Sequence, residues 1–239
     1  MKKYIKAKLP NFVYKKNNYK KVNYTGLNKV LYSINHKLLE INVNDKHNNH
    51  ILEVGGGAEP HINFMSLKNI KSYTILDSIK FKKQVLDLKK LKKIKKNNIN
   101  IFFLNYKKKN SFKKKNYTRL ISSHTFEHFE NFEDNFLKLM PLLNKNALIS
   151  TALPCDPGII WRFLQYFSYI KQKKIYQWKS FREKDLDDSR DHITPVQNIL
   201  KVMRYYFKNI KTIYFPLWLP IINFNIFLII QTKLSDFKD

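Results

Sequence analysis

The feature of the sequence that most constrains its fold is a short apolar segment that runs into three consecutive glycines. Residues 51–54 have the composition of a buried strand, and residues 55–57 are Gly-Gly-Gly. Glycine allows the backbone to turn tightly and a ligand to approach it closely. Asp77 closes the next apolar segment 22 residues after Gly55 (77 − 55), near the spacing at which a carboxylate meets a ribose diol. Pro60 stands where a dinucleotide site needs glycine, so the pattern favours a nucleoside ligand without a pyrophosphate.

Strand and helix patterns alternate through the rest of the chain. The further segments that we predict as strands cover residues 73–76, 99–104, 120–122, 147–153, 210–215 and 225–232. Helical periodicity is expected through residues 62–67, across the lysine-rich residues 79–94, and after Asn131, which suits an N-cap. This alternation is typical of a doubly wound α/β sheet, whose ligands sit at the carboxyl ends of the strands.

Two segments depart from this alternation. Residues 1–46 are expected to form a basic arm and a cap helix, for which Thr25 is a candidate N-cap, ahead of an α/β domain over residues 47–239. Residues 155–193 interrupt the alternation and predict a mainly helical insertion after the fifth strand. Residues 194–197, Thr-Pro-Val-Gln, resemble a capping box, so the next helix is expected to begin there.

Three observations bear on where such a chain works. Cys155 is the single cysteine, which excludes a disulfide framework and suits a reducing compartment. The basic residues 1–9 lack the apolar segment of a secretory signal behind them. Residues 213–230 are apolar, but prolines and asparagines interrupt them, which favours a strand–loop–strand over a membrane span. We therefore expect a cytoplasmic protein.

The net charge of +27 has two interpretations. A basic chain often binds nucleic acid or an anionic membrane surface. Only five of the 45 basic residues are arginines, however, although guanidinium groups are the usual readers of bases and phosphates. Lysine is abundant together with Asn, Ile, Phe and Tyr, the set that A/T-rich codons would enrich. We interpret most lysines as solvated surface, with an anionic partner as the alternative.

Four segments, in order, resemble the motifs of the class I S-adenosylmethionine (SAM)-dependent methyltransferases. Residues 52–57 (Leu-Glu-Val-Gly-Gly-Gly) resemble the first motif, and Asp77 matches the acidic residue that closes the second strand. Residues 121–128, which end in Glu-His, resemble the segment after the fourth strand. Residues 143–149 resemble the turn into the fifth strand, so that the resemblance covers about residues 50–154.

The resemblance implies a fold, a cofactor and a set of contacts. The fold would be a Rossmann-like, seven-stranded, mostly parallel sheet with helices on both faces, an antiparallel last strand and a helical insertion after strand five. The cofactor would be SAM. The residues implied to bind it are Gly55, Gly56 and Gly57 beside the methionine part, Glu53 at its amino group, Asp77 at the ribose, Asn105 near the adenine, and His124 and Thr125 around the methyl group.

Methyl transfer asks little of acid–base groups, because the sulfonium is already a good leaving group and alignment supplies much of the acceleration. A hydroxyl acceptor still needs a base, for which His128 and His192 are the candidates. For both histidines a purely structural role is the alternative. Arg162, Trp161 and Asp191, from the insertion, are the candidate substrate-binding residues. We expect no metal ion.

Three functions remain open at this stage. The leading one is a SAM-dependent methyltransferase that acts on an O or N atom of a small molecule, with a sugar or a precursor of a surface glycan or lipid as candidate. An RNA methyltransferase would suit the charge, but no separate RNA-binding motif is present. A non-catalytic nucleic-acid or membrane-surface binder with the same fold is the third, against which the intact Glu53, Gly55 and Asp77 argue. The sequence carries no signal for the oligomeric state.

Overall fold

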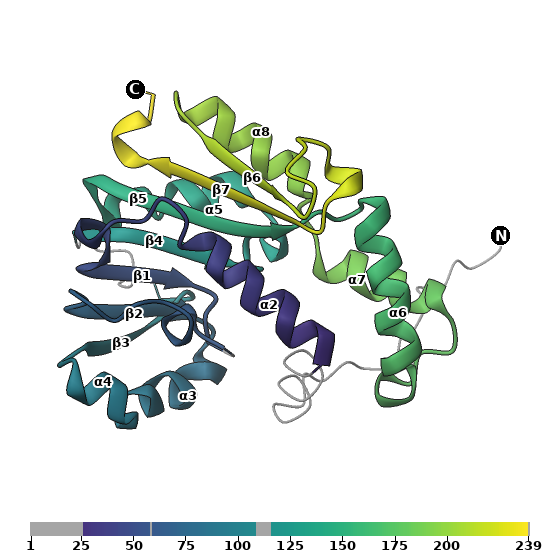
Figure 1. The fold of residues 1–239 in the computed structure, drawn as a ribbon, viewed down its shortest axis with the longest axis horizontal. Coiled ribbons are helices and arrows are strands. Elements are labelled where there is room, and N and C mark those ends of the chain that lie inside the picture. The colour runs from purple at the N-terminus through teal and green to yellow at the C-terminus, as the bar shows by residue number, and fades with distance from the viewer. Residues whose placement is uncertain (1–25, 58, 109–115, 239) are drawn as a thin grey trace.

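The structure, a computed structural model, describes residues 26–57, 59–108 and 116–238; Thr25 and the basic arm before it lie outside these residues. Seven strands form one sheet in the order β3-β2-β1-β4-β5-β7-β6 (Figure 1). Their bounds are β1 His50–Val54, β2 Ser72–Asp77, β3 Asn100–Asn105, β4 Tyr117–Ser123, β5 Leu143–Pro154, β6 Lys211–Phe215 and β7 Phe227–Lys233. The strands β1 to β5 pair in parallel, and β7 pairs antiparallel with β5 and β6. The predicted doubly wound sheet with an antiparallel last strand is confirmed.

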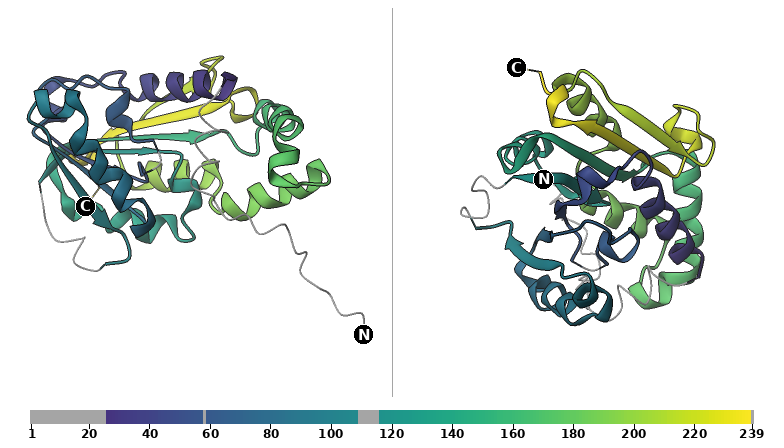
Figure 2. Two further views of the ribbon diagram at one scale, coloured as in Figure 1. Left: turned by 90° about the horizontal axis from the view of Figure 1, so that it is seen from below. Right: turned by 60° about the vertical axis from the view of Figure 1, so that its left-hand side comes forward.

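Helices cover both faces of this sheet. Their bounds are α2 Gly26–Leu39, α3 Lys82–Asp87, α4 Lys92–Lys96, α5 Phe132–Leu137, α6 Ile159–Tyr176, α7 Phe181–Asp191 and α8 Val196–Tyr206. One core cluster joins Leu39 of α2 and Val85 of α3 to one face, and a second joins Phe136 of α5 and Met203 of α8 to the other. The left panel of Figure 2 shows α2 on one side of the strands and α8 on the other. This three-layer arrangement buries apolar side chains on both faces of the parallel strands.

The expected helix after the glycines does not form. A single 3₁₀ turn, His61–Asn63, takes its place. Pro60 has an extended backbone there and lacks an N–H, and the N–H of His61 donates to the buried carboxylate of Glu53 instead of to a preceding turn (2.9 Å). The polar contact with the strand therefore outweighs the apolar spacing of residues 62–67.

The lysine-rich helix expected over residues 79–94 is interrupted. The structure has a 3₁₀ turn, then α3, a second 3₁₀ turn and α4. Leu91 adopts an extended backbone between the last two and accepts hydrogen bonds from Ile94 and Lys95. Because this break allows both Leu88 and Ile94 to be buried, packing against the sheet outweighs helix propensity.

The two predicted helix caps had different outcomes. The Asn131 side chain accepts a hydrogen bond from the Asp134 N–H, so its role as the N-cap of α5 is confirmed. The capping box at residues 194–197 is wrong, because the Thr194 hydroxyl donates to the carbonyl of Phe129. The Thr194 N–H also donates to the Glu127 carbonyl (2.9 Å), so Thr194 is bound to the loop after β4. The helix itself begins where the sequence predicted, since α8 starts at Val196.

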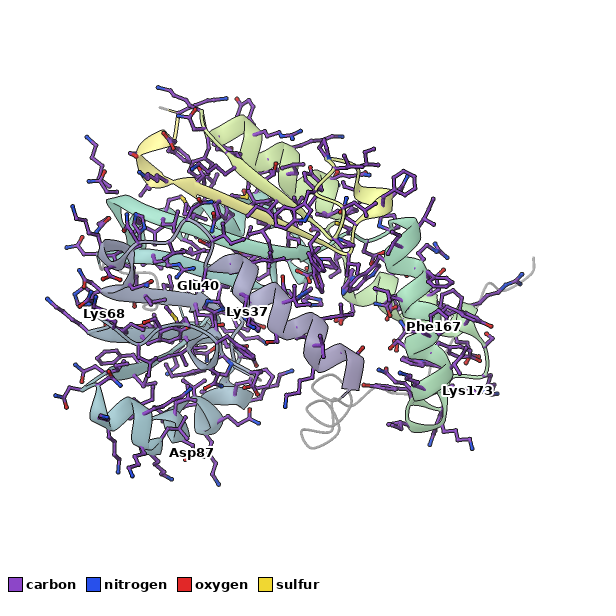
Figure 3. The ribbon with its side chains drawn as sticks, in the orientation of Figure 1. Lys37, Glu40, Lys68, Asp87, Phe167 and Lys173 are labelled. Carbon is purple, nitrogen blue, oxygen red and sulfur yellow. The ribbon has the colours of Figure 1, made fainter. Side chains whose placement is uncertain are left out.

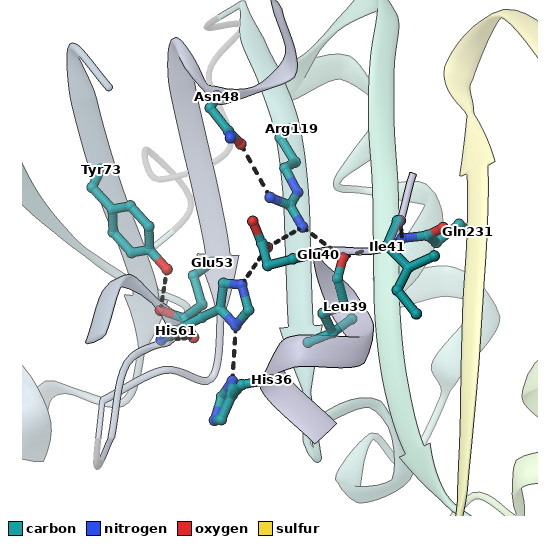
Figure 4. Close-up of polar contacts among 10 residues, drawn as sticks. All are labelled: His36, Leu39, Glu40, Ile41, Asn48, Glu53, His61, Tyr73, Arg119 and Gln231. Carbon is teal, nitrogen blue, oxygen red and sulfur yellow. Dashed lines mark hydrogen bonds and ion pairs between the residues drawn. The ribbon is translucent and has the colours of Figure 1, made fainter. Parts of the chain in front are cut away.

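A buried polar network fixes α2 to the sheet (Figure 4). Arg119 of β4 is fully buried, and its guanidinium donates to Glu40 (2.8 Å), to the Leu39 carbonyl (3.0 Å) and to Asn48 (3.0 Å). Glu40 also contacts a ring nitrogen of His61 at 2.6 Å. Burial disfavours the charged carboxylate, but the hydrogen bonds from His61 and Arg119 and their charges lower the pKa of Glu40 to about 2.

The segment after β5 folds as the helices α6 and α7, which lie beyond the carboxyl ends of the parallel strands (Figure 1). The outer face of α6 carries Phe163 and Phe167, which are 61% and 45% exposed, and Lys173, which is also exposed; Figure 3 labels Phe167 and Lys173. Residues 213–230 form the expected strand–loop–strand through β6 and β7. None of the described helices is both long and apolar enough to cross a membrane.

Candidate active site

The larger of two adjoining cavities opens at the carboxyl ends of β1, β2 and β4, with a volume of about 890 Å³. Its walls include Gly55, Asp77, Phe81, Tyr106, His124 and Thr125. The volume lies within the range of small-molecule and cofactor sites. Four residues that the sequence singled out for one ligand, Gly55, Asp77, His124 and Thr125, therefore meet at one cavity.

The glycine loop packs so closely that side chains are excluded from it. Gly55 has a φ of +84°, and a Cβ atom at this position would lie 2.0 Å from Oγ1 of Thr125. A Cβ on Gly57 would lie 2.6 Å from a carboxylate oxygen of Asp77. The loop thus needs glycine at Gly55 for its backbone angle and at both positions for space.

Asp77 connects the glycine loop to the cavity. Its two carboxylate oxygens accept the backbone N–H groups of Gly57 (2.8 Å) and Ser78 (2.5 Å). Burial raises the pKa of Asp77, although both backbone hydrogen bonds oppose this. Each carboxylate oxygen can accept a further hydrogen bond, so the side chain can hold a diol while it holds the loop.

Glu53 lies beneath the loop rather than in the cavity wall. It is 1% exposed, and its oxygens accept the His61 N–H (2.9 Å) and the Tyr73 hydroxyl (2.8 Å; Figure 4). Burial raises the pKa of Glu53 to about 8. Gly56 covers the carboxyl group, since a Cβ there would lie 2.1 Å from the carboxyl carbon. In this arrangement Glu53 supports the loop and does not line the larger cavity.

At the end of β3, the residues that line the larger cavity are the neighbours of Asn105 and not Asn105 itself. Asn105 accepts the Lys107 N–H with its side-chain oxygen (3.1 Å), while Tyr106 and Lys107 line the cavity. Phe81, at the start of α3, lines it as well. Sequence reasoning missed both aromatic rings, although each lies in the first residues after a strand that ends at the cavity.

A second cavity of about 340 Å³ lies between α2, α6, α7 and the loop after β4. Its walls include Glu127, Trp161, Gln165, Tyr176, Trp178 and Asp187. His124, His128 and Asp191 line both cavities. The two cavities therefore adjoin at these three residues, which gives the arrangement that a two-substrate transfer needs.

His128 and His192 come together at this junction, with ring centroids 5.2 Å apart. Nδ1 of His128 lies 2.8 Å from the Asp191 carbonyl oxygen, and Nδ1 of His192 lies 2.7 Å from a carboxylate oxygen of Asp156. Burial disfavours a charged ring, but the hydrogen bond to Asp156 and the nearby Glu127 carboxylate raise the pKa of His192 to about 8.

Glu127 is the buried anion beside these rings. It is 2% exposed, and one of its oxygens lies 3.5 Å from Nδ1 of His124. Burial opposes ionisation, yet the interaction with His124 and the charges of His128 and His192 lower the pKa of Glu127 to about 2. The sequence placed Glu127 beside a candidate base but did not mark it as a site residue, because enclosure by α2, α6 and α7 has no local signal.

The three candidate substrate-binding residues separate in the structure. Trp161 lines the second cavity, and Asp191 lines both cavities. Arg162 points elsewhere: its guanidinium pairs with Asp185 of α7 at 3.0 Å, and it lines neither cavity. Because Trp161 and Arg162 are adjacent on α6, they face different sides of that helix.

Solved structures similar to this chain are methyltransferases. The plantazolicin methyltransferase BpumL, in complex with S-adenosylhomocysteine (SAH), has a TM-score of 0.61 and 13% identity, with 93% of this chain and 91% of that chain covered. A SAM-dependent methyltransferase from Thermotoga maritima has a TM-score of 0.51 and 12% identity, with 93% and 96% covered. The CurJ carbon methyltransferase has a TM-score of 0.58 and 12% identity; 90% of this chain is covered, but it spans only 57% of that chain. No protein-family model matches the sequence, and no curated protein matches it significantly.

Proposed function

We propose that this chain, which has the fold of the class I SAM-dependent methyltransferases, binds SAM in the larger cavity and methylates a small molecule in the second. The observation that carries the proposal is the junction of the two cavities at His124, His128 and Asp191. In support, BpumL, at a TM-score of 0.56 and 15% identity, has also been solved with both a monoazolic desmethylPZN analog and SAH.

The walls of the larger cavity match the parts of SAM. The Asp77 carboxylate would accept the ribose hydroxyls, and the aromatic rings of Phe81 and Tyr106 offer apolar surface for the adenine. Gly55 leaves its backbone open to the methionine part, and Thr125 lies against it. Glu53 would act through the shape of the loop, because its oxygens are taken by Tyr73 and His61.

When bound, SAM supplies a methyl group on a sulfonium, and transfer forms a bond from that carbon to an acceptor O or N atom while the C–S bond breaks and leaves SAH. The protein's work is chiefly alignment across the junction of the cavities. An acceptor hydroxyl or ammonium must also lose a proton. His128, which lines both cavities, is the first candidate base, and His192, whose ring centroid lies 5.2 Å from that of His128 and which lines the second cavity, is the other.

The second cavity suits a small polar acceptor. It combines the aromatic rings of Trp161 and Trp178 with polar groups such as Gln165 and Asp187, and small-molecule sites typically combine apolar walls with a few polar groups. A sugar, or a precursor of a surface glycan or lipid, is the candidate acceptor, modified in the cytoplasm. The second candidate function is RNA methylation, which only the net charge of +27 favours.

Calorimetry with SAM and SAH tests the proposal. Binding should be in the micromolar range, which corresponds to about −8 kcal/mol. The full chain is used, and circular dichroism confirms that the sample is folded. No binding of either compound by the folded protein would refute a methyltransferase function.

A further inference from the structure

The carboxylate of Glu127 is buried at the junction of the two cavities without a hydrogen-bond partner for either oxygen among the residues that the structure describes. An unpaired buried carboxylate is costly, because desolvation is not repaid by hydrogen bonds. The neighbouring His124 ring lies 3.5 Å away, beyond a normal hydrogen bond. The nearby histidines supply charge, but neither carboxylate oxygen has a hydrogen-bond partner among the described residues, so both oxygens are available to a bound cation.

Two histidines present nitrogen atoms to this carboxylate. One ligand atom from each of Glu127, His128 and His192 lies within 4.8 Å of the others. Nδ1 of His128 is held by the Asp191 carbonyl (2.8 Å), and Nδ1 of His192 by the Asp156 carboxylate (2.7 Å). Metal-binding histidines characteristically donate their second ring N–H to a carbonyl or carboxylate in this way, which orients the ring and leaves Nε2 for the metal.

We propose that Glu127, His128 and His192 form a binding site for one divalent transition-metal ion between the two cavities. Two imidazoles and one carboxylate suit Mn²⁺, Fe²⁺ or Zn²⁺, and leave coordination positions open for other ligands. Glu127 and His128 come from the loop after β4, and His192 directly follows α7. A hydrogen bond from the Thr194 N–H to the Glu127 carbonyl holds these two segments together.

The position suggests what the ion would do. His128 lines the larger cavity and all three ligands line the second, so an acceptor oxygen bound to the ion would lie between them. A bound cation lowers the pKa of a coordinated hydroxyl and fixes its direction. With the ion bound, His128 would be its ligand, so the base role of His128 belongs to the metal-free chain. This role rests on the proposed methyl transfer, whereas binding of the ion does not.

The test is a metal titration of the tag-free full chain after treatment with a chelator. Mn²⁺ binding is followed by the loss of the free-ion electron paramagnetic resonance signal, and Zn²⁺ binding by competition with a chromophoric chelator. We expect one saturable site and a rise in melting temperature with Mn²⁺ or Zn²⁺. Glu127→Gln and His192→Asn should weaken binding by at least about tenfold.

Matched controls are Glu133→Gln, an exposed carboxylate on α5, and His50→Asn, at the amino end of β1. Both should bind the ion as the unaltered chain does. The proposal is overturned if the folded chain binds neither ion saturably, or if Glu127→Gln and Glu133→Gln bind it equally; Glu127 would then be only the counter-ion of the histidines. If a variant fails to fold, the metal-dependent melting temperature of the unaltered chain decides. SAM titrations of the same samples keep the two proposals separate. A chain that binds SAM but binds neither metal ion would overturn this inference and leave the proposed function standing.

Discussion

Asp77 has two tasks, since one carboxylate both holds the glycine loop and faces the larger cavity. Asp77→Ala should weaken SAM binding by about 1–3 kcal/mol, the scale of hydrogen bonds to a charged group. Calorimetry measures the change. Asp87→Ala, which removes an exposed carboxylate from α3 (Figure 3), is the control and should leave the affinity unchanged. Equal affinities for the two variants would contradict a ribose contact at Asp77.

Glu53 should make stability fall as pH rises. Its pKa is about 8 in the folded chain because of burial, above the ordinary value of 4.5. Between these two pH values the folded state therefore binds more protons than the unfolded state. The contribution of Glu53 to the free energy of unfolding is complete below about pH 4.5, and it is lost as the pH rises to about 8. The slope from this group is about 1.4 kcal/mol per pH unit within that window. In Glu53→Gln the amide oxygen can still accept the His61 N–H, and the amide NH2 can donate to the Tyr73 hydroxyl oxygen. This variant should remove the slope in urea unfolding; an unchanged slope would mean that Glu53 is ionised in the folded chain.

The residues of the site were predictable to different degrees. Gly55, Asp77 and Thr125 follow strand ends, and all parallel strands end at one edge of the sheet, so their meeting could be predicted from order along the chain. The burial of Glu53 beneath the loop could not be predicted in this way, because it depends on a contact with Tyr73 of the neighbouring strand. Arg162 failed for a similar reason: its partner, Asp185, comes from another helix.

At the scale of elements, the contact between α2 and the sheet depends on Arg119. Arg119→Met would leave Glu40 without one charged partner and the Asn48 side-chain oxygen without the guanidinium donor. The Leu39 carbonyl would lose one of its two side-chain donors and keep Gln231. The free energy of unfolding should fall by about 3–5 kcal/mol, the cost of breaking a buried ion pair from one side. Urea unfolding measures it, with Arg204→Met on the exposed face of α8 as control. Similar losses in both variants would show that the network does not hold α2.

Strands were predicted more reliably than helices. A buried strand is marked by a continuous apolar run, and each of the seven predicted strands overlaps an observed one. The apolar spacing of residues 62–67 predicted a helix, but Pro60 and the hydrogen bond from His61 to Glu53 prevented it. Such contacts with another element carry no local signal, which is why the length of the lysine-rich helix was also overestimated.

At the scale of the molecule, lysines dominate the charge of the exposed surface among the described residues. Lys37, Lys68 and Lys173, labelled in Figure 3, are exposed and contribute to the net charge of +27. The second cavity is lined by charged groups of both signs: the carboxylates of Glu127, Asp187, Asp188 and Asp191 lie there together with Lys184, Arg190 and three histidines. An anionic polymer would therefore be attracted chiefly to the lysine-rich surface, and less to the cavity in which we propose that the acceptor binds.

This distribution predicts weak RNA binding that does not depend on sequence. A single-stranded RNA oligomer should bind through lysine–phosphate contacts, with a Kd of about 10⁻⁴–10⁻⁶ M at physiological salt and a steep loss of affinity between about 50 and 200 mM salt. Fluorescence anisotropy with two oligomers of unrelated sequence measures both properties. Lys80 and Lys107 line the larger cavity and Lys184 lines the second. Exposed lysines such as Lys37, Lys68 and Lys173 line neither, so RNA that is held by these lysines should leave the SAM affinity unchanged. Tight binding of one oligomer and not the other at physiological salt, or RNA binding coupled to SAM, would instead favour RNA as the methyl acceptor.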